Sequence, residues 1–126
     1  MKSQKLNVKN DLCERTFDFS VRIYKLCREL NKKGINETVI RKQLLRSGTS
    51  IGANIEEAQA GQSRADFLSK YNIALKEARE TNYWLRLLNV VEVFTENELE
   101  SILNESNELV AILTTIVKNT RSNTKQ

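Results

Sequence analysis

The chain has 126 residues, a formal net charge of +4, no histidine, no proline and only four glycines. This length is enough for one domain with a real hydrophobic core, and the scarcity of proline and glycine favours long helices over a turn-rich β fold. The absence of histidine excludes His-based catalytic triads, the Glu-x-x-His ligands of di-iron bundles and most zinc chemistry.

The positive charge is concentrated at the two ends of the chain. Residues 1–10 carry three lysines and no acidic residue, and residues 118–126 carry Lys118, Arg121 and Lys125. Residues 95–117 carry five glutamates and no basic residue, and the segments between 11 and 94 are close to neutral. We therefore expect no basic groove built into the fold.

A first helix is expected to begin near Asn10 or Asp11, either of which can cap free amide groups, and to end at Lys33 and Gly34. Residues 1–9 then form a flexible basic tail. Opposite charges four residues apart fill the outer face of this helix, which is typical of a solvated surface. The apolar face carries Leu12, Thr16, Phe19, Ile23, Leu26 and Leu30.

A second helix is expected from about Asn36, a candidate N-cap, to about Ala60. Gly48 and Gly52 each cost roughly 1 kcal/mol of helix stability relative to alanine, so we expect their small size to permit the close approach of another backbone.

Beside the apolar face of this second helix lies a polar row. Its members are either simply exposed or form a partly buried hydrogen-bonded network. We predict that Arg46 pairs with Glu57 of the same helix or with Glu80 of the next one, and that the row has a structural role. The row consists of Gln43, Arg46, Ser50, Asn54 and Glu57.

A third helix is expected over residues 63–93, opening with the capping box Ser63-Arg-Ala-Asp66. Apolar or small residues alternate at spacings of four and three from Phe67 to Leu88, which indicates a helix packed against other helices. A second apolar row lies roughly 100° around the helix. Because a monomeric surface helix needs an apolar stripe of only roughly 100°, this helix is either central in the bundle or contacts another subunit. The candidate subunit-interface residues are Ile73, Trp84, Leu87 and Val91.

The opposite side of the third helix carries Lys76, Arg79, Tyr83 and Arg86, which we call the basic row. Three cations around one aromatic ring can bind phosphates and stack a base. An ordinary solvated face or the rim of an oligomer has the same composition, so both alternatives stay open. The four residues are our candidate nucleic-acid-binding residues.

A fourth helix is announced by the capping box Thr95-Glu-Asn-Glu98, and its apolar positions run from Leu99 to Val117. The polar residues 119–126 are expected to form a flexible C-terminal tail. Short connections force consecutive helices to run antiparallel. The sequence therefore predicts an all-α protein, an up-down-up-down antiparallel four-helix bundle over residues 10–118.

No pattern in the sequence indicates catalysis. Gly48 and Gly52 lie inside a helix and lack the Lys-Ser/Thr of a phosphate-binding loop, and Cys13 and Cys27 have no histidine to activate them. We expect a protein that is not an enzyme, with no catalytic residue, no metal and no cofactor. No apolar segment has the length of a signal-peptide core or a membrane span, so a cytoplasmic protein without membrane association is expected.

The stretch from Arg46 to Glu57 reads Arg-Ser-Gly-Thr-Ser-Ile-Gly-Ala-Asn-Ile-Glu-Glu. With Ser63, Asp66-Phe67, Ile73-Ala-Leu75, Glu80 and Leu85, it resembles the bacterial four-helix-bundle proteins encoded in intervening sequences of large-subunit ribosomal RNA genes. Relatives of that family include the accessory variability determinant of diversity-generating retroelements. The resemblance covers about residues 10–118. The positions that match the family's motif are Ser50, Ile51, Asn54, Ile55, Glu57, Ser63, Phe67 and Glu80.

The resemblance implies a long-helix bundle assembled as a ring-like homopentamer. It also implies association with nucleic acid and reverse transcriptase in the retroelement branch. This chain departs from the family near the turn between the second and third helices, where a glycine followed by a basic pair is usual. Ala58 and Gly61-Gln62 stand there instead.

Two functions are compatible with these patterns. The first is a non-catalytic homo-oligomeric module that associates with RNA or a nucleic-acid-processing protein through Lys76, Arg79, Arg86 and the basic tails. The second is a protein–protein interaction scaffold, which the wide apolar surface of the third helix indicates. Sensing of a small molecule has no support in the sequence.

Overall fold

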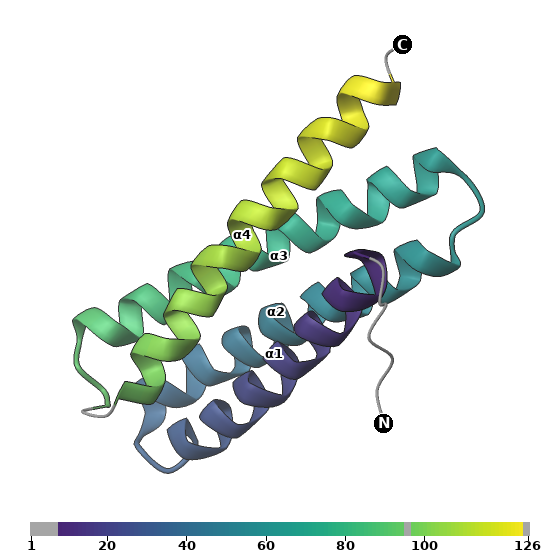
Figure 1. Cartoon of the computed structure of the whole chain (residues 1–126). Coiled ribbons are helices and arrows are strands. Elements are labelled where there is room, and N and C mark those ends of the chain that lie inside the picture. The colour runs from purple at the N-terminus through teal and green to yellow at the C-terminus, as the bar shows by residue number, and fades with distance from the viewer. Residues whose placement is uncertain (1–7, 95–96, 125–126) are drawn as a thin grey trace, which may run out of the picture.

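The computed structural model describes residues 8–94 and 97–124. Over these residues the chain forms four helices and no strand: α1 (Val8–Leu30), α2 (Ile35–Ala60), α3 (Arg64–Val90) and α4 (Asn97–Thr124). Consecutive helices run antiparallel (Figure 1), which confirms the predicted all-α four-helix bundle. Within the described part of the chain, no helix is long and apolar enough to cross a membrane.

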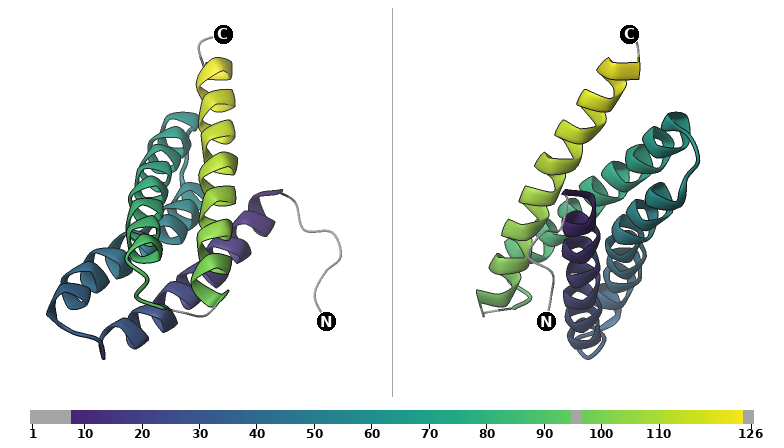
Figure 2. Two further views of the ribbon diagram at one scale, coloured as in Figure 1. Left: turned by 90° about the vertical axis from the view of Figure 1, so that its left-hand side faces the viewer. Right: turned by 45° about the vertical axis from the view of Figure 1, so that its right-hand side comes forward.

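The helices pack mainly in chain order. α2 lies against both α1 and α3, and α3 lies against α4. α1 and α4 pack less closely, and Figure 2 shows α4 crossing α1 at an angle and continuing past it. The C-terminal half of α4 therefore depends mainly on α3 for its packing.

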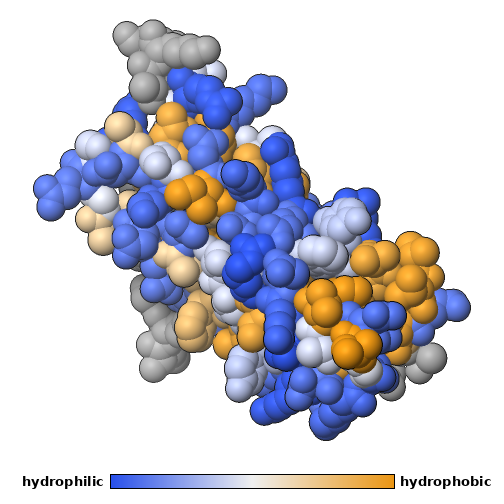
Figure 3. Space-filling model, turned by 180° about the vertical axis from the view of Figure 1, so that it is seen from behind, coloured by the Kyte–Doolittle hydropathy of each residue, from blue (hydrophilic) through white to orange (hydrophobic). Residues whose placement is uncertain are grey.

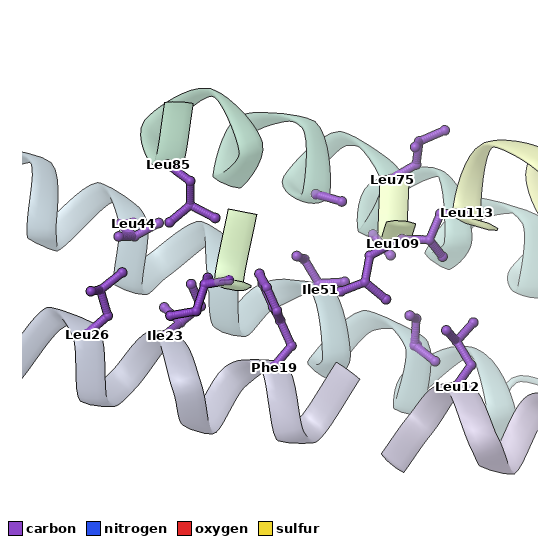
Figure 4. Close-up of a cluster of buried hydrophobic side chains, with 14 of the residues drawn as sticks. Leu12, Phe19, Ile23, Leu26, Leu44, Ile51, Leu75, Leu85, Leu109 and Leu113 are labelled. Atoms are coloured by element: carbon purple, nitrogen blue, oxygen red, sulfur yellow. The ribbon is translucent and has the colours of Figure 1, made fainter. Parts of the chain in front are cut away.

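The core consists of the apolar faces that the helical periodicity predicts. The predicted face of α1 is buried from Leu12 to Leu30, and the predicted face of α3 is buried from Tyr71 to Leu88, while Phe67 is half-buried. Side chains from all four helices point into the space between them (Figure 4).

The α1–α2 connection differs from the prediction. α1 spans Val8–Leu30, and the N-cap of α2 is Gly34, whose φ of 150° favours glycine. The carbonyl oxygen of Gly34 accepts hydrogen bonds from the backbone N–H and the hydroxyl of Thr38, at 2.9 and 2.7 Å. Asn36, the predicted cap, lies inside the first turn because the backbone caps the helix one residue before it starts.

The ends of α3 and α4 show one agreement and one difference. Ser63 is the N-cap of α3, and its hydroxyl accepts a hydrogen bond from the backbone N–H of Asp66 at 3.1 Å, as predicted. The second predicted capping box involves residues 95 and 96, which lie outside the described residues. α4 continues to Thr124, so the described part of the expected tail after residue 118 is helical.

Candidate nucleic-acid interface

The basic row lies on an accessible face of α3. Lys76, Arg79 and Arg86 are exposed, and Tyr83 is 51% exposed. The guanidinium carbon of Arg86 lies 5.8 Å from the centre of the Tyr83 ring. Since the four side chains share one face of one helix, they can contact the same ligand.

Asn82 connects this face to α4. Its Nδ2 donates hydrogen bonds to Ser106 Oγ at 3.1 Å and to Asn107 Oδ1 at 2.8 Å, and its Oδ1 accepts one from Arg86 Nε at 3.0 Å. These bonds position Arg86 next to the α3–α4 contact. The sequence did not indicate this role for Asn82, because an exposed asparagine has no periodic pattern that marks it.

A groove with a volume of about 430 Å³ runs between α3 and the C-terminal half of α4. It contains three cationic side chains and no acidic one, which corrects the expectation that the fold contains no basic groove. Lys118 and Arg121 were assigned to a flexible tail, but the continuation of α4 places both beside Arg79 of the basic row. We call it the α3–α4 groove; it is lined by Asn72, Leu75, Arg79, Thr114, Val117, Lys118, Arg121 and Ser122.

One signal in the sequence could have identified this groove. Thr114, Lys118 and Arg121 are spaced by four and three, which is the spacing of one helix face. Read as a helix rather than a tail, the segment would have placed both cations next to the groove-lining Thr114.

Acidic side chains of α4 lie on a different side of that helix. Arg15 of α1 donates hydrogen bonds to Glu105 Oε2 and Oε1 at 2.7 and 2.8 Å and to Glu108 Oε1 at 2.6 Å. The hydrogen bond to Glu105 is the main reason that the pKa of Arg15 is raised. These two glutamates therefore face α1 and do not neutralise the α3–α4 groove.

The polar row of α2 is only partly a network between helices. Arg46 donates hydrogen bonds to Glu77 Oε1 at 3.1 Å and to Glu80 Oε2, and its Nε and Nη2 also contact Gln43 Oε1. The predicted pairing of Arg46 with Glu80 is thus confirmed. The Arg46 side chain is 48% exposed, so the cluster lies at the surface rather than in the core.

The remaining members of the polar row do not join this cluster. Ser50 Oγ donates to the Arg46 carbonyl oxygen at 2.6 Å, and Asn54 Nδ2 donates to the Ser50 carbonyl oxygen at 2.8 Å. Both bonds stay within α2, and Glu57 is exposed. A buried hydrogen bond that the sequence did not reveal lies nearby, from Thr81 Oγ1 of α3 to Ser47 Oγ of α2 at 2.9 Å.

The candidate subunit-interface residues are not all covered within one chain. Ile73 is 39% exposed and Val91 is 56% exposed, while Trp84 and Leu87 are half-buried. Further exposed apolar side chains, including Ile35 and Val90, lie at the end of the bundle that holds the α1–α2 and α3–α4 connections. Figure 3 shows hydrophobic surface at this end of the molecule.

Comparisons with known proteins agree with the architecture. The family model described as 23S rRNA-intervening sequence protein matches residues 8–115. A crystal structure of a protein of unknown function from the S23 ribosomal protein family of Bacteroides thetaiotaomicron VPI-5482 is 51% identical in sequence, with a TM-score of 0.79. The match covers 87% of this chain and 97% of that one, and no curated protein matches this chain. The chain therefore belongs to the 23S rRNA-intervening sequence protein family.

Proposed function

We propose that this protein is a non-catalytic, self-associating helical module that binds RNA, alone or in a ribonucleoprotein, through the basic row of α3. The observation that carries the proposal is the state of the row's cations. Lys76, Arg79 and Arg86 are exposed around Tyr83, and none of the three forms an ion pair within residues 8–94 and 97–124. The description of the matched family refers to 23S rRNA, and the similar crystal structure is assigned to a ribosomal protein family.

The physical basis of the proposal is the release of counterions. Arg15 and Arg46 are already neutralised by glutamates, whereas an unpaired surface cation gains most by replacing the counterions of a phosphate. Stacking of one base on a tyrosine ring adds roughly 1–3 kcal/mol and tolerates any base. The row therefore suits a single-stranded RNA segment bound with little sequence preference.

The test is the affinity for a single-stranded RNA oligomer measured by fluorescence anisotropy in a salt series. For the wild-type protein we expect the logarithm of the association constant to fall linearly with the logarithm of salt concentration. The double substitution Lys76→Gln/Arg86→Gln removes two cations. It should therefore reduce the magnitude of that slope by about 1.4.

A matched control is available on α1 and α2. Arg28 lies over the Tyr24 ring at 5.9 Å, much as Arg86 lies over Tyr83, and Lys42 is exposed on α2. Arg28→Gln/Lys42→Gln removes the same charge and should leave the slope nearly unchanged. Failure of the wild-type protein to retain RNA at low salt would refute the proposal.

A second candidate function is a scaffold that binds other proteins. The exposed apolar residues at one end of the bundle, Ile35, Val90 and Val91 among them, favour it. A protein that self-associates but retains no RNA in the salt series would support the scaffold over the RNA-binding module.

A further inference from the structure

We propose that the α3–α4 groove seats phosphates of the same RNA strand that crosses the basic row; this inference rests on the proposed function. The groove contains Arg79, Lys118 and Arg121, and no acidic side chain lines it. All three cations are exposed, so they can reach a ligand without rearrangement of the bundle. Asn72, Thr114 and Ser122 add neutral polar groups to its lining.

Arg121 is held in position by a neutral partner. Its Nη2 donates a hydrogen bond to Asn72 Oδ1 at 3.2 Å across the α3–α4 contact. A guanidinium group has five N–H donors, so this bond orients the group and leaves other donors for phosphate oxygens. Because an amide neutralises none of the charge, the site keeps its attraction for anions.

The floor of the groove is apolar. Leu75 and Val117 line it and belong to the buried core. Cations above an apolar floor attract a phosphate more strongly than the same cations surrounded by water, because the local dielectric constant is lower. The groove is thus better suited to a phosphate than an isolated surface lysine.

Arg79 joins the groove to the basic row. It lines the groove and stands between Lys76 and Tyr83 in the row. From Asn72 to Arg86 the helical rise gives a length of roughly 21 Å, which accommodates several phosphates at about 3.4 Å per nucleotide in a stacked strand. The geometry fits a polymer backbone bound by several exposed cations, rather than one small anion in an enclosed site.

The experiment uses the full chain and oligouridylate as the RNA probe. Lys118→Gln/Arg121→Gln should weaken binding on the order of tenfold at low salt, and the magnitude of the salt slope should fall by about 1.4. The charge-conserving variant Lys118→Arg/Arg121→Lys should keep the wild-type slope. The Arg28→Gln/Lys42→Gln control removes two cations from α1 and α2 and should lose less than about twofold.

The outcomes separate this inference from the proposed function. Wild-type binding with equal affinities for the groove variant and the control would overturn the groove and leave the proposed function standing. No binding by the wild-type protein would overturn both. Thermal unfolding followed by circular dichroism should give the same midpoint for the groove variant and the wild type, since both side chains are exposed. An early-melting groove variant would transfer the test to the charge-conserving one, in which loss of the slope would overturn the inference.

Discussion

Individual cationic residues have different roles that depend on the acidic side chains within their reach. Arg46 lies between Glu77 and Glu80 and connects α2 to α3, whereas Arg79, on the same helix as those glutamates, faces the α3–α4 groove. Partial burial raises the pKa of Glu80, but the hydrogen bonds from Arg46 and Trp84 outweigh it, and the pKa lies below its ordinary value. The lowered pKa means that ionised Glu80 stabilises the folded state.

We predict that Arg46→Leu lowers the free energy of unfolding by about 0.5–1 kcal/mol at neutral pH and low salt. The effect is small because the pair is half-exposed and screened by solvent. Urea unfolding of the wild type and the variant measures it. The difference should shrink at high ionic strength.

The same pair makes a prediction about pH. A carboxyl group with a lowered pKa in the folded state contributes stability that is fully present above its ordinary pKa and is lost as the pH falls through the lowered value. The stability difference between the wild type and Arg46→Leu should therefore shrink as the pH falls below the ordinary value of 4.5. A difference that stays constant down to the acid unfolding transition would contradict the assignment to Glu80. Lys42→Leu, at an exposed position of α2 with no ion pair among the described residues, is the control.

Sequence patterns at the residue scale predicted the partner of Arg46 but only half of the polar row. Arg46 and Glu80 have long side chains that reach between adjacent helices, so helical spacing alone makes their pairing plausible. Ser50 and Asn54 instead bond to the carbonyl four residues earlier, a local alternative open to short polar side chains. The choice between a local and an inter-helix bond depends on the distance between the helices, which periodicity does not provide.

At the scale of the elements, the two glycines of α2 determine how closely α1 approaches. A Cβ atom on Gly52 would lie 3.2 Å from the backbone oxygen of Thr16, and one on Gly48 would lie 2.8 Å from Cγ2 of Ile23. The expected close approach of a backbone is therefore confirmed at Gly52. At Gly48 the neighbour is a buried, β-branched side chain with little freedom to move.

We predict that Gly48→Ala destabilises the protein by about 1–3 kcal/mol, although alanine favours the helix by roughly 1 kcal/mol. The reason is the contact with Ile23, which is fully buried. A double-mutant cycle with Ile23→Ala checks this, because removing the Ile23 side-chain atoms should make Gly48→Ala nearly neutral or stabilising. Equal costs of Gly48→Ala in both backgrounds would show that Ile23 is not the cause.

The end of α4 shows how tertiary contacts extend an element beyond its local signals. Residues 119–124 are polar, with asparagine, serine and threonine that do not favour a helix interior. The described part of this segment is nevertheless helical, and the contact between Arg121 and Asn72 anchors it to α3. Local composition predicted fraying because it does not include the neighbouring helix.

For the whole molecule, the exposed apolar residues of α3 support our proposal that copies of the chain associate, as the family resemblance implies with a pentameric ring. We predict that Ile73→Glu/Val91→Glu lowers the absolute mass measured by light scattering towards that of a single chain. Both side chains are already exposed, so the substitutions should leave the core intact. Trp84 and Leu87 are half-buried, and their replacement would confuse assembly with folding.

A matched control for assembly is Phe17→Glu/Tyr24→Glu on α1, which also replaces two exposed apolar residues by acidic ones. We expect this variant to keep the wild-type mass if the α3 surface mediates association. A wild-type protein with the mass of one 14.5 kDa chain would contradict self-association altogether.

The sequence by itself determined the number of helices, their order and their buried faces, because the spacing of apolar residues directly reflects the periodicity of an α-helix. It also indicated the basic row, whose four members lie on one helix. Only the tertiary structure decided which residues of different helices meet. The helical end of α4 turns Lys118 and Arg121 toward Arg79, while Arg15 holds Glu105 and Glu108 on the side of α1. Adding up charges along the chain could not reveal this separation, since it arises from the packing of helices distant in sequence.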